Sequence, residues 1–256
     1  MSKAIRGMRI IKDIVNQIDG SFFDKLKFVK SFSLHYFLKS IGINYFKFPK
    51  LKIKIEELKF ITRKNTLDFW VLWKDYEKEI FNQLESEIKN GDTFIDIGAN
   101  IGRYSMVMAN NGLNVFSFEP IKSNFKLLEH HEKINNLNKK IIPYNIGLGN
   151  TKERTEIFYF AHKYGEASVV FNFKNGIKEK INIDKLDNIK IKPKNNCFMK
   201  IDVEGFEYDV LLGAKNFIKK YRPKIIVEIW KEETKDLLNE FNYSKSGEIW
   251  YPNEKN

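Results

Sequence analysis

The sequence predicts an α/β fold built on a doubly wound, mostly parallel β-sheet. Strand-like and helix-like segments alternate regularly over residues 93–146, and such alternation favours parallel strands joined by crossover helices. The first strand-like segment, 93–98, leads through a turn containing Gly98 and Gly102 into a helix-like segment. In open α/β sheets, a nucleotide-like ligand meets the backbone at such a turn. The fold class therefore indicates where a cofactor site lies.

Composition agrees with an enzyme-sized unit. The chain has 256 residues, with 43% hydrophobic and 14% aromatic content, enough for one α/β domain plus an extension. Cys197 is the single cysteine in the sequence, which excludes an internal disulfide and a cysteine-rich zinc site. We find no signal-peptide pattern and no apolar run of membrane-spanning length, so we expect a cytoplasmic protein.

Positive charge is concentrated in the N-terminal part of the sequence. Residues 1–54 carry 12 lysines and arginines against three aspartates, a net charge of +9, whereas the whole chain carries +11. Apolar residues recur there at helical spacing, which predicts one or two amphipathic helices. We favour a helical cap with a solvated basic face. Peripheral contact of this segment with an anionic membrane is the sharper alternative, and no recognition motif favours nucleic acid.

The next segments mark the predicted domain boundary. Short β-rich runs that predict a small antiparallel ribbon lie at 51–55, 58–62 and 67–73. A predicted helix at 76–88 ends before Gly91, a suitable residue for a helix C-terminus. We therefore divide the chain into a basic helical and β extension at 1–74 and a main domain at 75–256.

The main domain is predicted to alternate between strands and helices. Its strands are predicted at 93–98, 114–119, 141–146, 197–205 and 224–230, and its helices at 101–110, 121–136, 208–220 and 232–240. Before the fourth strand, β-rich runs at 155–160, 168–173 and 180–183 predict a β insertion in place of a crossover helix. Two short strands around Ser246 and Gly247 complete the sheet.

The acids near the glycine turn indicate the ligand. Asp96 precedes the turn in the pattern Asp-x-Gly-x-Asn-x-Gly, and its carboxylate would repel the pyrophosphate of a dinucleotide. S-adenosylmethionine has no phosphate, and its methionyl end carries an ammonium and a sulfonium group that a carboxylate attracts. Glu119 ends the second strand, where it is well placed to accept hydrogen bonds from both ribose hydroxyls. The two acids together therefore favour S-adenosylmethionine.

Five separated motifs carry a resemblance to a known family. They are Asp96-Ile97-Gly98-Ala99-Asn100-Ile101-Gly102 with Tyr104-Ser105; Phe118-Glu119-Pro120; Leu186-Asp187; Lys200-Ile201-Asp202-Val203-Glu204-Gly205 with Glu207; and Gly213-Ala214 followed by 223–228. Over residues 75–230 the chain resembles the FkbM-like, S-adenosylmethionine-dependent class I methyltransferases. The resemblance implies a Rossmann-like fold with a seven-stranded sheet and helices on both faces. It also implies O-methylation, on sugars of glycans or glycolipids or on natural products.

The expected cofactor site combines the motif residues with the strand ends. Its members are Asp96, Gly98, Ala99, Asn100, Gly102, Tyr104, Ser105, Glu119, Pro120, Asn145 and Asp202. Asn145 is included because it ends the third predicted strand, where it is placed to meet the adenine edge. No motif in residues 1–74 matches the family, so no family role extends to that segment.

Three carboxylates are the candidates for acceptor chemistry. A hydroxyl is a poor nucleophile without a base, and Asp202, Glu204 and Glu228 follow strands adjacent to the cofactor strand. We expect them to pack together, with Asp202 as the base and with Glu204 and Glu228 orienting the acceptor. Alternatively, the three ligate a divalent cation that acidifies the hydroxyl. Glu207 is interpreted only as an acid favourable at a helix N-terminus.

Several other residues receive weaker interpretations. His162 in the β insertion and Trp230 after the fifth strand are candidate contacts for an acceptor, Trp230 by stacking on a sugar ring. His130 and His131 are interpreted as exposed. Lys200 is interpreted as a structural residue that points away from the neighbours of Asp202.

Two alternatives to a sugar O-methyltransferase stay open. One is an RNA 2′-hydroxyl or small-molecule natural-product methyltransferase that holds an anionic substrate with the basic extension. The other is a binding module with a degenerate methyltransferase fold and no catalytic activity. The sequence predicts neither the identity of the acceptor nor the oligomeric state.

Overall fold

The computed structural model describes residues 3–43, 45–160, 162–170 and 176–254. The chain forms two compact units. The first comprises Met1–Lys78 with Ala161–Gly165, and the second comprises Glu79–Phe160 with Glu166–Asn256. Among the described residues, none of the helices has the length and apolar character needed to cross a bilayer.

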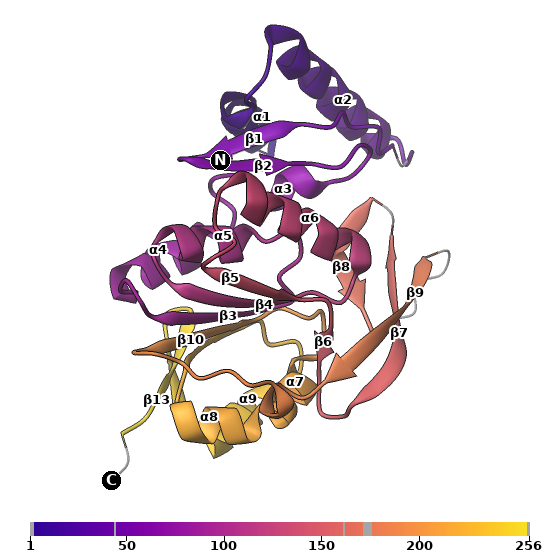
Figure 1. The fold of residues 1–256 in the computed structure, drawn as a ribbon. Coiled ribbons are helices and arrows are strands. Elements are labelled where there is room, and N and C mark those ends of the chain that lie inside the picture. The colour runs from indigo at the N-terminus through magenta and orange to yellow at the C-terminus, as the bar shows by residue number, and fades with distance from the viewer. Residues whose placement is uncertain (1–2, 44, 161, 171–175, 255–256) are drawn as a thin grey trace. The chain divides into compact units, whose positions relative to one another are not determined.

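A seven-stranded sheet forms the centre of the second unit (Figure 1). Its strand order is β12-β13-β11-β10-β3-β4-β5. The strands are β3 (Thr93–Ile97), β4 (Asn114–Phe118), β5 (Ile141–Tyr144), β10 (Cys197–Ile201), β11 (Lys224–Val227), β12 (Tyr243–Ser246) and β13 (Ile249–Pro252). The pairs β4-β5, β3-β4, β3-β10 and β10-β11 are parallel, while β13 is antiparallel to both β11 and β12. The predicted mostly parallel seven-stranded sheet is therefore confirmed.

Helices cover the sheet, which explains its apolar strands. Every residue of β3 and β10 is buried, as parallel strands covered on both faces require. In Figure 1, α4 (Lys78–Glu87), α5 (Arg103–Asn110) and α6 (Lys122–Ile134) lie along one face, and α7 (Glu207–Gly213), α8 (Lys215–Tyr221) and α9 (Glu232–Glu240) along the other. A single apolar cluster joins β3, β10 and β11 to α7, α8 and α9.

Three sequence predictions around this sheet need correction. The strand predicted at 197–205 ends at Ile201, so Asp202 and Glu204 lie in the loop after it. The helix predicted at 208–220 is divided into α7 and α8 around Ala214. A Cβ on Gly213 would lie 1.9 Å from the carbonyl oxygen of Gly149, so the chain packs closely against a loop where the helix is interrupted. The strand predicted at 224–230 ends at Val227, and Glu228 and Trp230 therefore lie beyond the sheet.

A second sheet follows β5 in the chain. Its order is β6-β9-β7-β8, with β6 at Gly147–Leu148, β7 at Glu153–Phe160, β8 at Lys163–Ser168 and β9 at Ile177–Asp184. β7 and β9 are antiparallel. The predicted run at 168–173 was wrong in position, because β8 ends at Ser168. Residues 171–173 of that prediction lie outside the described residues. The short 3-10 helix η1 (Leu186–Asn188) leads toward β10.

The first unit contains the two predicted helices and a hairpin. Its elements are α1 (Lys3–Gln17), α2 (Phe22–Ser40), β1 (Lys52–Ile55), β2 (Leu58–Ile61) and α3 (Asp68–Val71). α2 begins at a capping box, in which Ser21 accepts from the N–H of Asp24 and the Asp24 carboxylate accepts from the N–H of Ser21. Phe28 and Phe32 of α2 pack against Phe69.

The strand predicted at 67–73 was wrong, because this segment forms α3. The carboxylate of Asp68 accepts hydrogen bonds from the backbone N–H and the guanidinium of Arg63. The N–H of Trp70 bonds to the carbonyl of Leu67. These local contacts favour a helical turn over the extended conformation that the aromatic and β-branched residues indicated.

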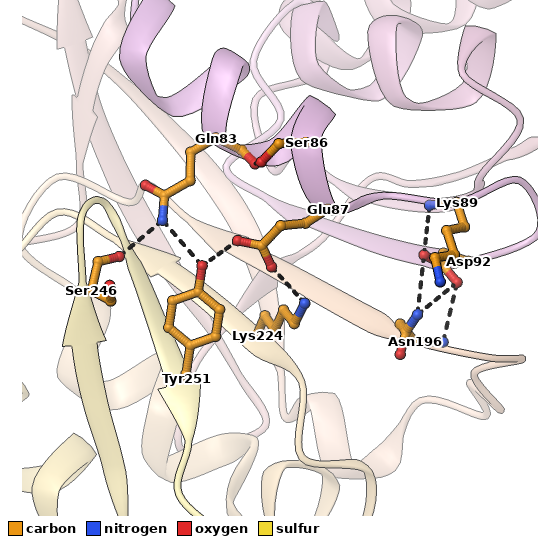
Figure 2. Close-up of polar contacts among 9 residues, drawn as sticks. All are labelled: Gln83, Ser86, Glu87, Lys89, Asp92, Asn196, Lys224, Ser246 and Tyr251. Carbon is orange, nitrogen blue, oxygen red and sulfur yellow. Dashed lines mark hydrogen bonds and ion pairs between the residues drawn. The ribbon is translucent and has the colours of Figure 1, made fainter.

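Polar contacts stabilise the edge of the sheet where β3, β10 and β11 begin (Figure 2). Lys224 at the start of β11 pairs with Glu87 of α4 at 2.5 Å, and Glu87 also accepts from the hydroxyl of Tyr251. The carboxylate of Asp92 accepts from the backbone N–H and the side-chain amide of Asn196 at 3.2 and 3.3 Å. The contacts of Glu87 join β11 and β13 to α4, and those of Asp92 join the starts of β3 and β10.

Candidate active site

The carboxyl ends of β3, β4 and β10 bring the predicted site residues together. Ile97 is in register with Phe118 of β4 and with Ile201 of β10. The residues that follow these three strands are therefore neighbours at one edge of the sheet. They are Gly98, Glu119 and Asp202.

Gly98 allows the loop after β3 to approach the end of β10. Its φ is +81°, and a Cβ at this position would lie 1.9 Å from the carbonyl oxygen of Asp202. The N–H of Asp202 donates to the carbonyl of Ile97 at 3.0 Å, and the N–H of Gly98 donates to that of Phe118 at 3.0 Å. Because the nearest atoms belong to the backbone, a side chain at Gly98 would displace the loop.

Glu119 connects the glycine loop to the start of α6. Its Oε2 accepts from the N–H of Asn100 at 2.8 Å, and its Oε1 accepts from the N–H of Ile121 at 2.8 Å. Asn124 adds a longer side-chain contact to Oε1 at 3.4 Å. The carboxylate is buried, so Glu119 fixes both loops as well as presenting a charge at the end of β4. Sequence reasoning did not foresee this structural role.

Asn100 provides a buried acceptor at the same loop. Its φ is +51°, a left-handed conformation that asparagine adopts more readily than most residues. The Oδ1 atom of Asn100 is buried and has no hydrogen-bond partner. A buried acceptor without a partner costs about 1–3 kcal/mol, so a ligand that donates a hydrogen bond here would remove that cost.

Asp96 lies in the interior behind the loop. Its carboxylate accepts from the hydroxyl of Ser105 at 2.6 Å, and that hydroxyl also lies 2.6 Å from Ser117 Oγ. Burial raises the pKa of Asp96 above its ordinary value, while Lys200 and Ser105 act in the opposite direction. Asp96 and Ser105 are both buried and bond to each other in the interior, next to the glycine loop.

Lys200 pairs with Asp202, contrary to our interpretation. Its Nζ lies 2.7 Å from Oδ2 of Asp202 and 4.6 Å from the ring centre of Tyr104, and the lysine is buried. The ring of Tyr104 in turn stacks on Phe81 at 4.2 Å. Residues i and i+2 of a strand share one face, so the strand periodicity itself was a signal that could have found this pair.

The three candidate catalytic carboxylates are not gathered as a metal site. The side chain of Asp202 is 30% exposed, Glu204 is half-buried, and Glu228 is exposed beyond β11. Within the described residues, no group of three or more histidine, cysteine, aspartate or glutamate side chains is arranged to hold a metal ion. The alternative that Asp202, Glu204 and Glu228 together ligate a cation is not met by this arrangement of the described residues. Asp202 pairs instead with Lys200.

Glu207 is a buried acid at the same edge of the sheet. Its position in the sequence indicated an acid favourable at a helix N-terminus. It lies at the N-terminus of α7, and its carboxylate accepts from the N–H of Gly205 at 2.9 Å. Burial raises the pKa of Glu207, and hydrogen bonds from backbone N–H groups oppose that change. Its contacts are those of an N-terminal helix residue.

Three further predicted site residues are Asn145, Trp230 and His162. Asn145 donates to the carbonyls of Glu119 and Pro120 at 2.9 and 3.0 Å, so it holds the loop after β4. Trp230 is 49% exposed. His162 belongs to the first unit, where its ring stacks on Phe46 with centroids 3.6 Å apart.

Two further residues complete the loop. Gly102 precedes α5 with φ +87°, and the N–H of Ala99 donates to the carbonyl of Phe118 at 3.0 Å.

His131 is buried and its Nδ1 lies 2.7 Å from the carbonyl oxygen of Ile101, so the predicted exposure of His131 was wrong. Its position three residues after the buried Leu128 was a signal of the inward face.

The fold and this edge define an α/β protein with a candidate cofactor site at the carboxyl ends of its parallel strands. The sequence profile described as the Methyltransferase FkbM domain matches residues 96–245. The match covers more than half of the chain, and it includes the glycine loop, Glu119 and Asp202. The chain belongs to the FkbM family of S-adenosylmethionine-dependent methyltransferases.

Solved structures with related folds share little sequence with the chain. It is similar to an FkbM methyltransferase from Methylobacillus flagellatus KT, with 15% identity and a TM-score of 0.49, over 97% of this chain and 59% of that one. The chain thus spans less than two thirds of that protein's length.

Two further solved structures are also similar to the chain, at lower sequence identity. A precorrin-6y C5,15-methyltransferase from Geobacter metallireducens GS-15 has 11% identity and a TM-score of 0.43, over 70% of this chain and 75% of that one. A tRNA (uracil-54, C5)-methyltransferase from Pyrococcus abyssi, solved with S-adenosyl-L-homocysteine, has 12% identity and a TM-score of 0.45, over 76% and 38%. No curated protein matches the sequence.

Proposed function

We propose that the chain binds S-adenosylmethionine at the carboxyl edge of its sheet and transfers the methyl group to a hydroxyl oxygen. The acceptor we propose is a sugar in a glycan, a glycolipid or a related metabolite. The observation that supports this proposal best is the buried Glu119 carboxylate, held beside the glycine loop by the N–H groups of Asn100 and Ile121. A fixed carboxylate at the end of the second parallel strand suits the hydroxyls of a ribose.

The chemistry of the surrounding groups fits the cofactor. Asn100 Oδ1 is a buried acceptor without a partner, which suits a donor group of the cofactor. Gly98 keeps the loop free of side-chain bulk. The carboxylates of Asp96 and Asp202 favour a ligand whose methionyl end carries positive charge. In our proposal the contact positions are Gly98, Ala99, Asn100, Gly102, Glu119, Pro120, Asn145 and Asp202, and Asp96, Tyr104 and Ser105 support them from the interior.

Asp202 is our proposed base. Methyl transfer forms an oxygen–carbon bond to the acceptor while the sulfur–carbon bond breaks and sulfur leaves as a neutral thioether, so the protein must accept the hydroxyl proton. Lys200 contacts Oδ2 of Asp202 and holds the carboxylate in one orientation. The proton would pass to the other carboxylate oxygen. Glu204 and Glu228 are proposed to orient the acceptor.

The proposal is tested by methyl transfer from labelled S-adenosylmethionine to panels of glycans, glycolipids, RNA and small hydroxylated metabolites. We expect label in a sugar hydroxyl and its loss with Asp202→Asn even at cofactor concentrations that saturate the variant, as calorimetric titration of that variant establishes. Asp236→Asn, at an exposed position of α9, is the matched control and should retain activity. Full activity of Asp202→Asn would remove Asp202 from the mechanism.

The panel also separates the two alternatives. Transfer to RNA or to a small natural product in place of sugars would identify the acceptor class directly. Binding of the cofactor without transfer to any acceptor class would favour a binding module.

A further inference from the structure

α2 of the first unit is apolar on two opposite faces. Phe28, Phe32 and His35 are buried, at the spacing of one helix face. A second group of large apolar residues is exposed to solvent. It consists of Phe22 (74% exposed), Phe23 (69%), Leu26 (51%), Phe37 (62%) and Ile41 (58%), the last at the C-cap of the helix.

The exposed group lies on one side of the helix, near its two ends, with the exposed residues Lys30 and Ser33 between them. At 100° per residue, Phe23, Leu26, Phe37 and Ile41 all lie on the side of the helix opposite Phe28. A helix of a globular protein usually turns charged and polar residues to solvent on this side. Large exposed apolar side chains gathered on one side of a helix are typical of a contact with a partner or a membrane. We call these residues, together with Phe22, the outer face of α2.

Basic residues accompany the outer face. α2 contains four lysines and one aspartate, and that aspartate, Asp24, is engaged in the capping box at the N-terminus of the helix. Lys27 and Lys30 are exposed, and helical geometry places both on the side of the outer face. Large apolar side chains flanked by lysines match the arrangement that an interfacial helix needs at an anionic bilayer surface.

We propose that the outer face of α2 docks the protein on an anionic lipid surface, with the helix lying in the plane of the interface. A second copy of the chain is a poorer occupant, because two outer faces in contact would oppose lysines of the same charge. The lipid headgroups supply the opposite charge and the acyl boundary supplies the apolar environment. This docking is independent of the proposed methyl transfer, since it rests on the first unit alone.

The test is co-sedimentation of the full chain with lipid vesicles. Vesicles of phosphatidylcholine with phosphatidylglycerol should bind the protein, vesicles of phosphatidylcholine alone should bind it much more weakly, and added salt should weaken binding. Phe23→Ser combined with Phe37→Ser should weaken binding at least about tenfold. Lys27→Gln combined with Lys30→Gln should weaken it roughly thirtyfold on anionic vesicles.

Matched variants in the second unit control for unspecific effects. Ile142 and Ile177 are exposed by 49% and 41%, so Ile142→Ser with Ile177→Ser removes comparable apolar surface elsewhere. Lys192→Gln with Lys245→Gln removes two exposed lysines. Both control variants should bind vesicles like the unaltered protein, and circular dichroism should show all variants folded.

Three outcomes would overturn the proposal. The first is failure of the full chain to bind anionic vesicles. The second is an equal loss of binding in the α2 variants and in the controls. The third is a dimer, detected by sedimentation velocity without lipid, that the Phe23→Ser and Phe37→Ser changes abolish, because the outer face would then be an interface between copies.

Discussion

Glu119 combines a structural contact with its proposed role in binding. Its two carboxylate oxygens accept from backbone N–H groups of Asn100 and Ile121, so its removal leaves donors without partners in a buried place. We expect Glu119→Ala to weaken S-adenosylmethionine binding at least about tenfold and to lower the free energy of unfolding by about 1–3 kcal/mol. Calorimetric titration and denaturant unfolding measure these two effects.

The control for this prediction is Glu233→Ala. Glu233 is exposed on α9, and its replacement should change neither quantity by more than about 0.5 kcal/mol. Unchanged cofactor affinity in Glu119→Ala would contradict the assignment of Glu119 to the ribose.

Asp96 makes a prediction about pH. Because burial raises its pKa above the ordinary value of 3.8, the folded protein holds this proton more tightly than the unfolded chain. Its contribution therefore favours folding below the ordinary pKa and is lost as pH rises through the folded pKa. Asp96→Asn cannot titrate, so the unfolding free energy of the unaltered protein minus that of the variant should fall as pH rises above about 4.

Denaturant unfolding of the two proteins at a series of pH values measures this difference. We expect it to reach a plateau above the folded pKa. A difference that is constant with pH would show that Asp96 titrates alike in the folded and unfolded chains.

The pair of Lys200 and Asp202 is tested by a double-mutant cycle. Lys200 is buried and lies 2.7 Å from Asp202, so each single substitution removes a close charge partner from the other side chain. We expect Lys200→Met and Asp202→Asn to show a coupling energy of about 1–3 kcal/mol in unfolding measurements. Effects that add within about 0.5 kcal/mol would show that the pair is energetically unimportant.

At the residue scale, the sequence predicted where the site residues lie along the strands better than it predicted which side chains they contact. Asp96, Glu119 and Asp202 could be assigned to one edge because each stands at or just after the end of a predicted parallel strand. Their hydrogen-bond and ion-pair partners could not be predicted in the same way, because the strand pattern only partly defines the directions of the side chains. The burial of His131 and the contact of Lys200 with Asp202 were both predicted wrongly, although helix and strand periodicity contained a signal for each. The bonds of Glu119 to two loops depended on tertiary structure.

The loop between β3 and α5 gives the clearest prediction about an element. A Cβ on Gly98 would lie 1.9 Å from a backbone oxygen, whereas a Cβ on Gly91 would lie 3.2 Å from a side-chain nitrogen of Asn195. The φ angles are similar, +81° and +89°, so the two positions differ mainly in space. We expect Gly98→Ala to destabilise the protein by at least about 3 kcal/mol and Gly91→Ala by about 1 kcal/mol.

Denaturant unfolding compares the stabilities of the two variants. Affinity for the cofactor should fall in Gly98→Ala and stay unchanged in Gly91→Ala. Equal losses of stability would mean that the left-handed backbone conformation, and not the close approach to β10, accounts for the glycine.

Element types were predictable where the sequence pattern was long and regular. The strands and helices between 93 and 144 lie close to their predicted positions, because buried parallel strands and amphipathic helices have distinct periods. The segment 67–73 was predicted as a strand from its apolar and aromatic residues. It forms a short helix because Arg63 and Asp68 make local contacts that residue preferences do not include.

At the scale of the whole molecule, the sheet order and the family agree on a methyltransferase. Five strands are parallel and two C-terminal strands add an antiparallel edge, and the FkbM profile spans residues 96–245. The sequence predicted this architecture because strands and helices alternate regularly and because β3, β4 and β10 each lead into a motif. It did not predict the acceptor, since specificity depends on loops and surfaces whose sequences form no motif.

The most direct test of the central claim is calorimetric titration of the purified chain with S-adenosylmethionine and S-adenosylhomocysteine, with NAD as the control. We predict saturable binding of the first two ligands and none of NAD, because Asp96 and Glu119 flank a loop that suits a cofactor without a pyrophosphate. The proposed site would be contradicted if neither S-adenosylmethionine nor S-adenosylhomocysteine bound, or if NAD bound with comparable affinity.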